Sequence, residues 1–564
     1  GLGLYAAGVF DRKKADADDT AVARPDAPPA KPNPWRNAGP DIPEDTDTPR
    51  PGRQGVGLPL DVVGGGNPQP PRPPERFPPP NGPPGLVRPV PPPDLDPVPE
   101  PIPVPRPDPV RPPPMRPDPN VPLVRPQPVG LLRPAARMVP ITPTRAADKS
   151  EVKLPGSAEV TCYAGGGRFI LLRIPSARQV AVFDVSEGKV AKYVPLPEEG
   201  ALIAGGMSHL YVLAPDKNVI QRWNLETFAR EATAPNPVPG QPKQILTGHA
   251  TDGPLFVVST GGFQAVDTTT FQSAPVPVKG GRGAPQSFGN RVPQVRVSAD
   301  GRVIGWWDPN LGPSGLNSLV LGADEAKGYS QHISAGAVLP GQDGTLFTST
   351  GLYTPDLKPL GNRRPISPWS PGPVPAAQGG FYLEFPATRG PMDRPADGVA
   401  LKVLGDDRTV ADLGMPDGLD LPTRPVNPRA PGLQVCDRVF LVPDAKALVI
   451  LNNTGDRLTV HRVDAEGLLK KSPVPYLFVS GQPPVAERST TFSYTPTVKS
   501  KAGGVKIAVT IGPDGMKVVG DKIVWAVPRN FAGDEVSVIL TVSDASGQEV
   551  IHTFILPVTD RPRR

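Results

Sequence analysis

The chain has 564 residues, enough for three or four domains, but its composition shows that not all of it can pack into a core. Half of its 84 prolines lie between residues 21 and 150, which leaves residues 151–564 for folded domains. The net charge is only +5, with Lys and Arg interspersed among Asp and Glu. No basic block of the kind that binds phosphates is present, so the composition argues against nucleic acid as a partner.

Cysteine and histidine usage argues against a metal centre. With two cysteines, Cys162 and Cys436, the chain has neither a disulfide framework nor a thiolate zinc cluster. Five histidines are scattered singly, without the spacing of metal ligands. They are His209, His249, His332, His461 and His552. We therefore expect no metal and no cofactor.

The first ten residues, GLGLYAAGVF, are uncharged and small or apolar, and DRKK follows at once. Ten residues are too few to cross a bilayer, which takes about 20. We interpret residues 1–11 as the possible remnant of a membrane segment that begins upstream; an arbitrary N-terminus is the alternative. Basic residues directly after an apolar segment favour the cytoplasmic side, so this flank argues weakly against export.

Residues 12–148 read as a disordered proline-rich linker. PVPEPIPVPRPDPVRPPPMRPDP at 97–119 cannot form a helix or an interior strand, because proline lacks the amide donor and fixes φ. We expect polyproline II, extended by about 3.1 Å per residue, which would hold a head clear of a membrane. RPPERFPPP at 72–80 has the character of a ligand for an aromatic groove, so a docking strip is the alternative to a spacer.

A short phrase occurs three times after the linker, at intervals of about 40 residues. Its copies are VAVFDVSEGKV around Asp184, IQRWNLETFAR around Asn224 and FQAVDTTTFQS around Asp267, and a β-rich run precedes each. Strand, turn, strand and an Asx-type turn at this period are typical of a β-propeller blade.

The propeller pattern continues to about residue 470. Asp-Gly pairs at 300–301 and 343–344 predict hairpin turns, because both residues tolerate positive φ. We count seven blades over 150–470, with six or eight as alternatives because the later blades are irregular. Their runs lie at 169–190, 210–230, 255–273, 295–328, 343–360, 381–413 and 438–464.

VFDVSEGKV and VSADGRVIGWW resemble the YVTN/PQQ-like and WD40-like propellers, over about 320 residues and with motifs generic to propellers. Cys162 and Cys436 precede inner strands of the first and seventh blades, which become neighbours when a ring closes. A disulfide between them would clasp the ring, provided that the Cα atoms lie within about 7 Å. The alternative is that both are small buried hydrophobic residues.

Residues 474–560 predict a separate β-sandwich. Val536, Val538, Leu540 and Val542 occupy every second position, as the inward-facing residues of a half-buried strand do. PDGMKVVGDKIVWAVP resembles the cadherin-like, dystroglycan-type immunoglobulin domains of bacterial surface proteins. The matching residues are Pro513, Gly515, Met516, Trp525 and Pro528. The resemblance implies that Met516 and Trp525 are core residues. The clustered acidic motifs of calcium-binding cadherins are absent.

The motifs of common enzyme classes were sought and not found: there is no Gly-x-Ser-x-Gly, no phosphate loop, no His-Glu-x-x-His and no dinucleotide fingerprint. We therefore expect a non-enzymatic protein of the bacterial cell envelope. It would bind an unidentified protein or glycan through a propeller face displayed, as a monomeric head, on a proline-rich stalk. A sensor half of a membrane-anchored signalling protein, such as a receptor kinase, is the first alternative. A quinone- or metal-dependent propeller enzyme is the second, and a cytoplasmic scaffold stays open.

Overall fold

The computed structural model describes residues 130–131, 141–145, 147–287, 291–322, 325–361, 371–386, 398–421, 433–481 and 483–560, without the side chains of 553 and 555. All of them fall within one compact unit, Met115–Arg564. The predicted membrane remnant at 1–11 and nearly all of the predicted linker at 12–148 lie outside the described residues. Among the residues described, no helix is long and apolar enough to cross a membrane.

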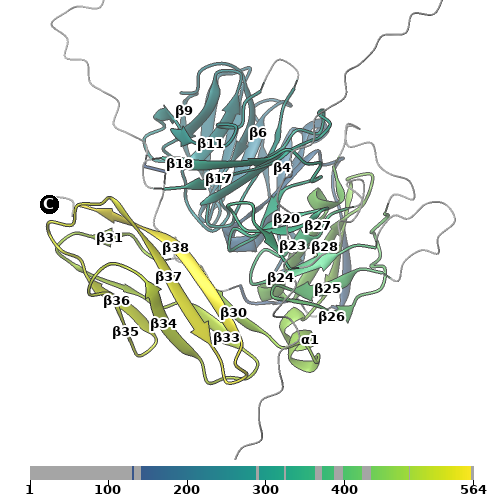
Figure 1. The fold of residues 1–564 in the computed structure, drawn as a ribbon. Coiled ribbons are helices and arrows are strands. Elements are labelled where there is room, and N and C mark those ends of the chain that lie inside the picture. The colour runs from purple at the N-terminus through teal and green to yellow at the C-terminus, as the bar shows by residue number, and fades with distance from the viewer. Residues whose placement is uncertain are drawn as a thin grey trace, which may run out of the picture. The chain divides into compact units, whose positions relative to one another are not determined.

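The described chain is built of strands, with one α-helix, α1 (Ala465–Lys471), and four 3-10 turns (Figure 1). The all-β prediction is confirmed. The 3-10 turns are η1 (Gly165–Gly167), η2 (Pro175–Ala177), η3 (Val435–Asp437) and η4 (Pro443–Ala445).

Seven sheets, numbered in chain order, occupy the described part of residues 149–462, and their strands pair antiparallel except at one edge of sheet 4. In sheets 1 to 3 consecutive strands lie side by side. Sheet 1 holds β2 (Val160–Ala164), β3 (Phe169–Ile174), β4 (Gln179–Asp184) and β5 (Lys189–Pro195). Sheet 2 holds β6 (Leu202–Gly205), β7 (His209–Ala214), β8 (Val219–Asn224) and β9 (Arg230–Pro235). Sheet 3 holds β10 (Pro242–Leu246), β11 (Leu255–Ser259), β12 (Gly262–Val266) and β13 (Ser273–Pro275).

Sheets 4 to 6 follow the same plan, with a fifth strand in sheet 4. Sheet 4 holds β15 (Gln294–Val297), β16 (Val303–Trp307), β17 (Leu316–Leu321), β18 (Ala326–Gln331) and, parallel to β18, β14 (Val278–Lys279). Sheet 5 holds β19 (Leu339–Pro340), β20 (Leu346–Thr348), β21 (Gly351–Tyr353) and β22 (Pro359–Leu360). Sheet 6 holds β23 (Val374–Pro375), β24 (Phe381–Glu384), β25 (Ala400–Val403) and β26 (Asp406–Asp412).

Sheet 7 joins the two ends of this region. It holds β27 (Val439–Val442), β28 (Ala447–Leu451) and β29 (Arg457–Arg462), and its outer strand is β1 (Lys149–Lys153). The register runs from Lys149 opposite His461 to Lys153 opposite Arg457. The strand that precedes sheet 1 therefore completes the last sheet, a pairing across some 300 residues that the sequence analysis did not anticipate.

The innermost strands of successive sheets contact one another in order: β2 with β6, β6 with β10, β10 with β15, β15 with β19, and β19 with β23. The turn η3, just before β27, contacts β2 and so returns to the start. Antiparallel sheets packed face to face around an axis, with their inner strands adjacent, form a β-propeller.

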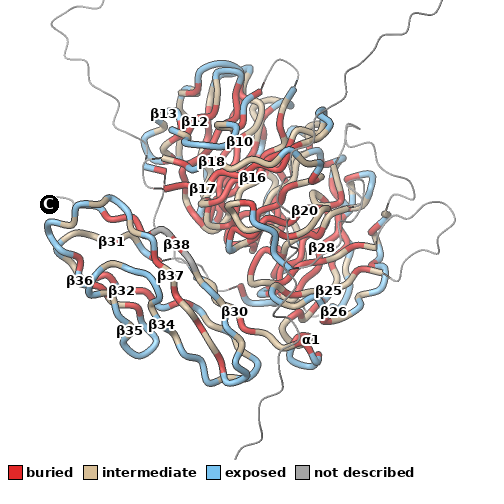
Figure 2. The backbone as a smooth tube through the Cα atoms, in the orientation of Figure 1, coloured by how far each residue is buried: buried red, intermediate tan, exposed pale blue. Residues whose placement is uncertain are grey.

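The apolar core lies between the sheets (Figure 2). Strands β3, β4, β11, β16 and β28 are buried along nearly their whole length. Their nearly continuous Val, Ile, Leu and Phe content is what a strand covered by a neighbouring sheet on each face requires. One core cluster combines residues of sheet 1 and sheet 7, among them Ile170, Phe183, Phe440 and Val449.

The C-terminal strands form two packed sheets with a core of their own. One sheet has the order β31 (Ala486–Glu487), β38 (Glu549–Thr559), β37 (Glu535–Ser543), β34 (Lys506–Ile511). The other has the order β32 (Thr491–Tyr494), β36 (Lys522–Ala526), β35 (Lys517–Val519). A separate pair joins β30 (Leu477–Ser480) to β33 (Thr497–Ser500). Phe492 and Trp525 from one sheet pack with Val538, Leu540 and Leu556 from the other.

Candidate functional site

A cavity of about 440 Å³ lies on the axis of the propeller. All seven sheets contribute to its wall, chiefly through the innermost strands β2, β6, β10, β15, β19 and β23 and through the segment that runs from η3 into β27. Its size falls in the range of small-molecule sites, roughly 300–1,000 Å³. We call this cavity the axial channel.

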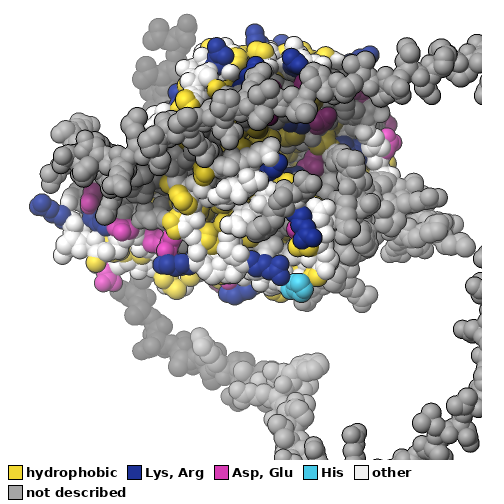
Figure 3. All heavy atoms as spheres, turned by 90° about the horizontal axis from the view of Figure 1, so that it is seen from above, with side chains coloured by type: hydrophobic (Ala, Val, Ile, Leu, Met, Phe, Trp, Pro, Cys, Tyr) yellow, Lys and Arg dark blue, Asp and Glu magenta, His cyan; other side chains and the backbone are white. Residues whose placement is uncertain are grey.

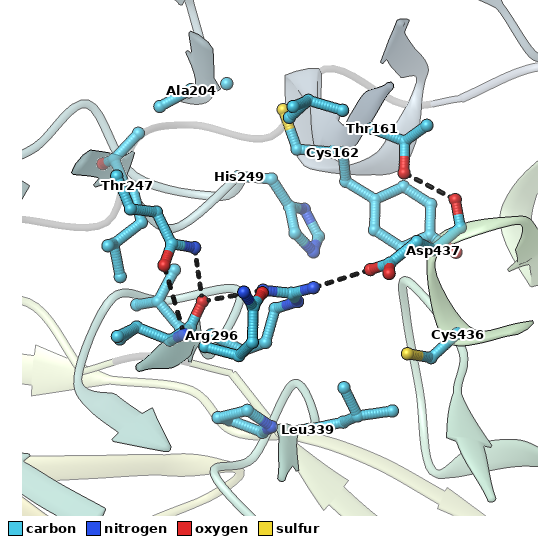
Figure 4. Close-up of a pocket in the computed structure, with 18 of the residues that line it drawn as sticks. Thr161, Cys162, Ala204, Thr247, His249, Arg296, Leu339, Cys436 and Asp437 are labelled. Atoms are coloured by element: carbon cyan, nitrogen blue, oxygen red, sulfur yellow. Dashed lines mark hydrogen bonds and ion pairs between the residues drawn. The ribbon is translucent and has the colours of Figure 1, made fainter. Parts of the chain in front are cut away.

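An ion pair spans the axial channel (Figure 4). The Arg296 guanidinium, on β15 of sheet 4, donates from Nη2 to Oδ1 of Asp437 in η3, at 2.7 Å. The inner strands of sheets 5 and 6 come between those of sheets 4 and 7 in the order of contacts, so this pair joins two sheets that are not neighbours. Both side chains are partly exposed to the channel, at 28% for Arg296 and 14% for Asp437.

Several neighbours hold the two charged groups in place. Arg296 Nη1 donates to the Val295 carbonyl at 3.0 Å, and its guanidinium carbon lies 5.5 Å from the centre of the buried Trp307 ring. Asp437 Oδ2 accepts the amide of Gln434 at 3.1 Å. Burial acts to lower the pKa of Arg296, but the Asp437 carboxylate outweighs it and raises the pKa above its ordinary value. Arg296 is therefore charged at neutral pH.

The triple-glycine turn η1 covers one end of the axial channel. The Gly166 amide donates to the His249 carbonyl at 2.8 Å, and the Gly166 carbonyl accepts from Gln378 Nε2 at 2.5 Å. His249 follows the inner strand of sheet 3, and Gln378 follows the inner strand of sheet 6. Sheets 3 and 6 lie on either side of sheet 1 but are not its neighbours, so a residue bonded to both must lie over the axis.

Glycine is needed in this turn for steric reasons. Gly165, Gly166 and Gly167 all have positive φ, from 61° to 97°, and all three are buried. A Cβ on Gly167 would lie 2.3 Å from Gln378 Nε2 and 2.8 Å from Ala377 Cβ. The GGGR run, which a tight turn alone would explain, thus also closes one end of the channel.

His249 lines the axial channel as a neutral side chain. Burial lowers its pKa to about 4, so the imidazole is uncharged at neutral pH. Its ring lies 5.2 Å from that of Tyr163, which in turn contacts Phe440 at 5.3 Å, edge to face. The Tyr163 hydroxyl donates to the Leu441 carbonyl at 3.4 Å. These rings form an apolar part of the wall.

Both cysteines line the axial channel, one in β2 and the other in η3, and both are free thiols. The possible disulfide between Cys162 and Cys436 does not form in the structure. Burial raises the pKa of Cys162 to about 12, and burial together with the neighbouring Asp437 carboxylate raises the pKa of Cys436 further. Neither sulfur is therefore a thiolate at neutral pH, as a nucleophile or a metal ligand would need to be.

The three repeated Asx residues lie far from the channel, at the outer hairpin of sheets 1, 2 and 3. Each side-chain oxygen accepts the backbone amides two and three residues further on. The distances are 2.9 and 3.2 Å for Asp184, 2.8 and 2.9 Å for Asn224, and 2.8 and 2.8 Å for Asp267. Only Asp184 is buried, at 2% exposure, and its Oδ2 also accepts two N–H groups of Arg168. These residues are structural.

The five residues that carry the C-terminal resemblance also have structural positions. The Met516 amide donates to the Pro513 carbonyl at 3.0 Å, and Gly515, with φ at 83°, lies in that turn. Met516 packs against the sandwich core, whereas Trp525 is inside it at 1% exposure. Pro528 begins the turn that brings Phe531 against Trp525, with their rings 5.2 Å apart.

The sequence analysis missed the residues that distinguish the axial channel: Arg296, Asp437 and His249. A signal was present for the first, because Arg296 interrupts the apolar pair Val295 and Val297 on an inner strand. Nothing in the sequence shows that its partner lies 141 residues away. Within the described residues, no group of three or more His, Cys, Asp or Glu side chains is placed to hold a metal ion.

Basic and acidic side chains are mixed on the surface as well. Figure 3 shows one face of the molecule, on which the described Lys, Arg, Asp and Glu side chains are interspersed and no patch of one sign stands out.

Comparison with known proteins adds little. No family model and no curated protein matches the chain. Among solved structures, it is similar to the β-propeller domain of Myceliophteria thermophila Cps50 (Swd1), at 12% identity and a TM-score of 0.34, covering 56% of this chain and 99% of that one. It is also similar to Kuenenia stuttgartiensis hydrazine synthase, at 13% identity and a TM-score of 0.28, covering 72% of this chain and 97% of that one. Similarity this weak carries no argument about ligand or reaction, so the fold assignment rests on the sheet topology.

Proposed function

We propose that this chain is a non-enzymatic binding protein of the bacterial cell envelope that recognises a protein or glycan ligand on the propeller. The observation that carries the proposal is the axial channel, walled by all seven sheets, spanned by the Arg296–Asp437 pair and covered at one end by η1. A concave site with a few fixed polar groups in an apolar wall is the usual form of a binding pocket.

The chemistry of the channel favours binding over catalysis. Its ion pair is held by backbone partners, its imidazole is neutral, and its two thiols have raised pKa values. A general acid or base needs a pKa near the working pH and a proton within reach. Rigid, paired groups in the wall instead suit recognition, since they lose little conformational entropy when a ligand binds.

We further propose the finer architecture that the sequence predicts. The seven sheets would be the seven blades of one ring, closed by the pairing of β1 with β29. The C-terminal sandwich would be a cadherin-like, dystroglycan-type immunoglobulin domain, and the proline-rich residues 12–148 would be its stalk at the envelope. The buried Trp525 and the turn at Pro513–Met516 support the domain proposal, because they occupy the positions that the resemblance assigns to them.

The test is a binding screen of the full chain against a glycan array and a library of immobilised peptides. We expect a selective hit whose affinity falls when Arg296→Met and Asp437→Asn are combined, a pair of changes that removes both members of the ion pair and leaves the net charge of the channel unchanged. Fractionation of the native cells, followed by blotting, tests the location, which should be the envelope fraction. A chain that binds neither library would overturn the proposed binding function.

A further inference from the structure

We propose that the axial channel takes the uncharged end of a glycan chain, one or two sugar residues long. This inference rests on the proposed binding function and names the class of ligand for its site. Three features of the channel carry it: its balanced charge, its covered end, and the mixture of paired polar groups with aromatic rings in its wall.

The charge balance disfavours an ionic ligand. Arg296 and Asp437 neutralise each other across the channel at 2.7 Å, and the adjacent imidazole of His249 is neutral because burial lowers its pKa to about 4. An anion bound to Arg296 would compete with Asp437 and leave a net negative charge in a cavity of low dielectric, which is costly. A peptide terminus is also charged, so its entry would likewise leave a net charge in the channel.

Hydroxyl groups match what the ion pair leaves unused. A guanidinium has five N–H donors, and the bonds of Arg296 to Asp437 and to the Val295 carbonyl account for two of them. A carboxylate accepts up to about four hydrogen bonds. Because a sugar hydroxyl both donates and accepts, one hydroxyl can bond to the guanidinium and its neighbour to the carboxylate without disturbing the pair. Tyr163 and Phe440 supply apolar surface for the C–H face of the ring.

The covered end decides which part of a glycan can enter. Because Gly166 is bonded to sheets 3 and 6 over the axis, a polymer cannot be threaded through the channel. Only a chain terminus can enter, from the other end. The volume of about 440 Å³ corresponds to about 15 water molecules at roughly 30 Å³ each. A hexose with its ring and hydroxyl groups fits that space, and a second residue fills the remainder.

The experiment measures binding of the full chain to defined sugars by calorimetry and saturation-transfer NMR. The neutral probes are methyl glycosides of glucose, galactose, mannose and N-acetylglucosamine and their disaccharides. The charged probes are glucuronic acid and N-acetylneuraminic acid. We expect at least one neutral probe to bind and its charged counterpart to bind at least tenfold more weakly. A derivative of the bound glycan whose recognised terminus carries one further sugar should not bind.

Two further readouts locate the site. Combining Arg296→Met with Asp437→Asn should weaken binding roughly 10- to 100-fold, as expected for loss of hydrogen bonds to charged groups. The matched control combines Lys402→Met with Glu384→Gln, an ion pair of similar exposure that does not line the channel, and should leave binding unchanged. In the wild-type chain the bound sugar should slow methanethiosulfonate labelling of Cys162 at least tenfold, which needs no substitution.

The outcomes separate this inference from the proposed function. If glycans bind but neither the channel variant nor Cys162 labelling responds, the binding function stands and the channel inference is wrong. Preferential binding of the acidic sugars, or of glycans that expose no free terminus, also overturns it. If only peptides bind, the function stands with a protein ligand and the glycan inference fails. If no probe of any class binds, both fail.

Discussion

The closure of the channel by η1 makes a sharp prediction for Gly167→Ala. The new Cβ would lie 2.3 Å from Gln378 Nε2 and 2.8 Å from Ala377 Cβ, distances that no relaxed structure shows. Gln378 is only 5% exposed, so it has little room to move except by giving up its bond to the Gly166 carbonyl. The substitution should therefore break the link between sheet 6 and the glycine turn.

Two terms set the size of the effect. An alanine at φ 97° costs about 1–2 kcal/mol of backbone strain. Leaving a buried amide and carbonyl without partners adds about 1–3 kcal/mol. We expect Gly167→Ala to lower the free energy of unfolding by about 2–5 kcal/mol, measured as a shift of the urea midpoint at constant slope.

Gly200→Ala is the matched control, because no atom lies within 4 Å of the position of its Cβ and its φ is not positive. It should change stability by no more than about 0.5 kcal/mol. Gln378→Ala, alone and combined with Gly167→Ala, completes a double-mutant cycle. Removing the clashing amide should make the double variant less destabilised than the sum of the two single variants. Strict additivity, or a Gly167→Ala variant as stable as the control, would refute the proposed contact.

Three other predictions follow from the same structure. The pKa of His249 is about 4 in the folded chain and about 6.5 in the unfolded chain, so the unfolded chain binds a proton first as pH falls. The free energy of unfolding should therefore decrease between pH 6.5 and pH 4. His249→Gln should make this decrease smaller, as measured by urea titrations at each pH. Cys162 and Cys436 should react with iodoacetamide at pH 8 at least about 100-fold more slowly in the native chain than in urea, as judged by mass spectrometry, since burial raises the pKa of both. Asp184→Ala should cost about 2–3 kcal/mol and Asn224→Ala about 1 kcal/mol in chemical denaturation, because Asp184 is buried and also accepts two N–H groups of Arg168, whereas Asn224 is only partly buried; equal losses would show that burial is irrelevant at this turn.

The features that the sequence predicted well are those with local causes. An Asx turn is specified within three residues, so Asp184, Asn224 and Asp267 were recognisable from one phrase and its repeats. The strands were recognisable because a sheet covered on both faces needs nearly continuous apolar residues, and β3, β11 and β28 have them. The same local logic applies to the hairpin between β37 and β38, where a polar SDASGQE run separates two alternating strands.

The features that the sequence could not predict depend on pairs of residues far apart in the chain. Arg296 and Asp437 are separated by 141 positions, and Gly166 and Gln378 by 212. A propeller brings such residues together only after every sheet has packed, and a single sequence contains no record of which loops then meet. The triple glycine shows this limit, since three consecutive glycines are typical of a tight turn but do not reveal that the turn covers the channel.

The outer turns and the channel wall depend on different residues, and this affects how the site can evolve. The outer turns stabilise each sheet by itself, through amides two and three residues away, so a substitution there is felt mainly within one sheet. The channel wall instead takes one strand or turn from every sheet, and a change in any of them alters a shared cavity. Ligand specificity can therefore change through a few inner-strand positions such as Arg296 without altering the turns that hold the sheets. Different residues thus determine stability and recognition: Asp184→Ala should change the first, and Arg296→Met with Asp437→Asn the second.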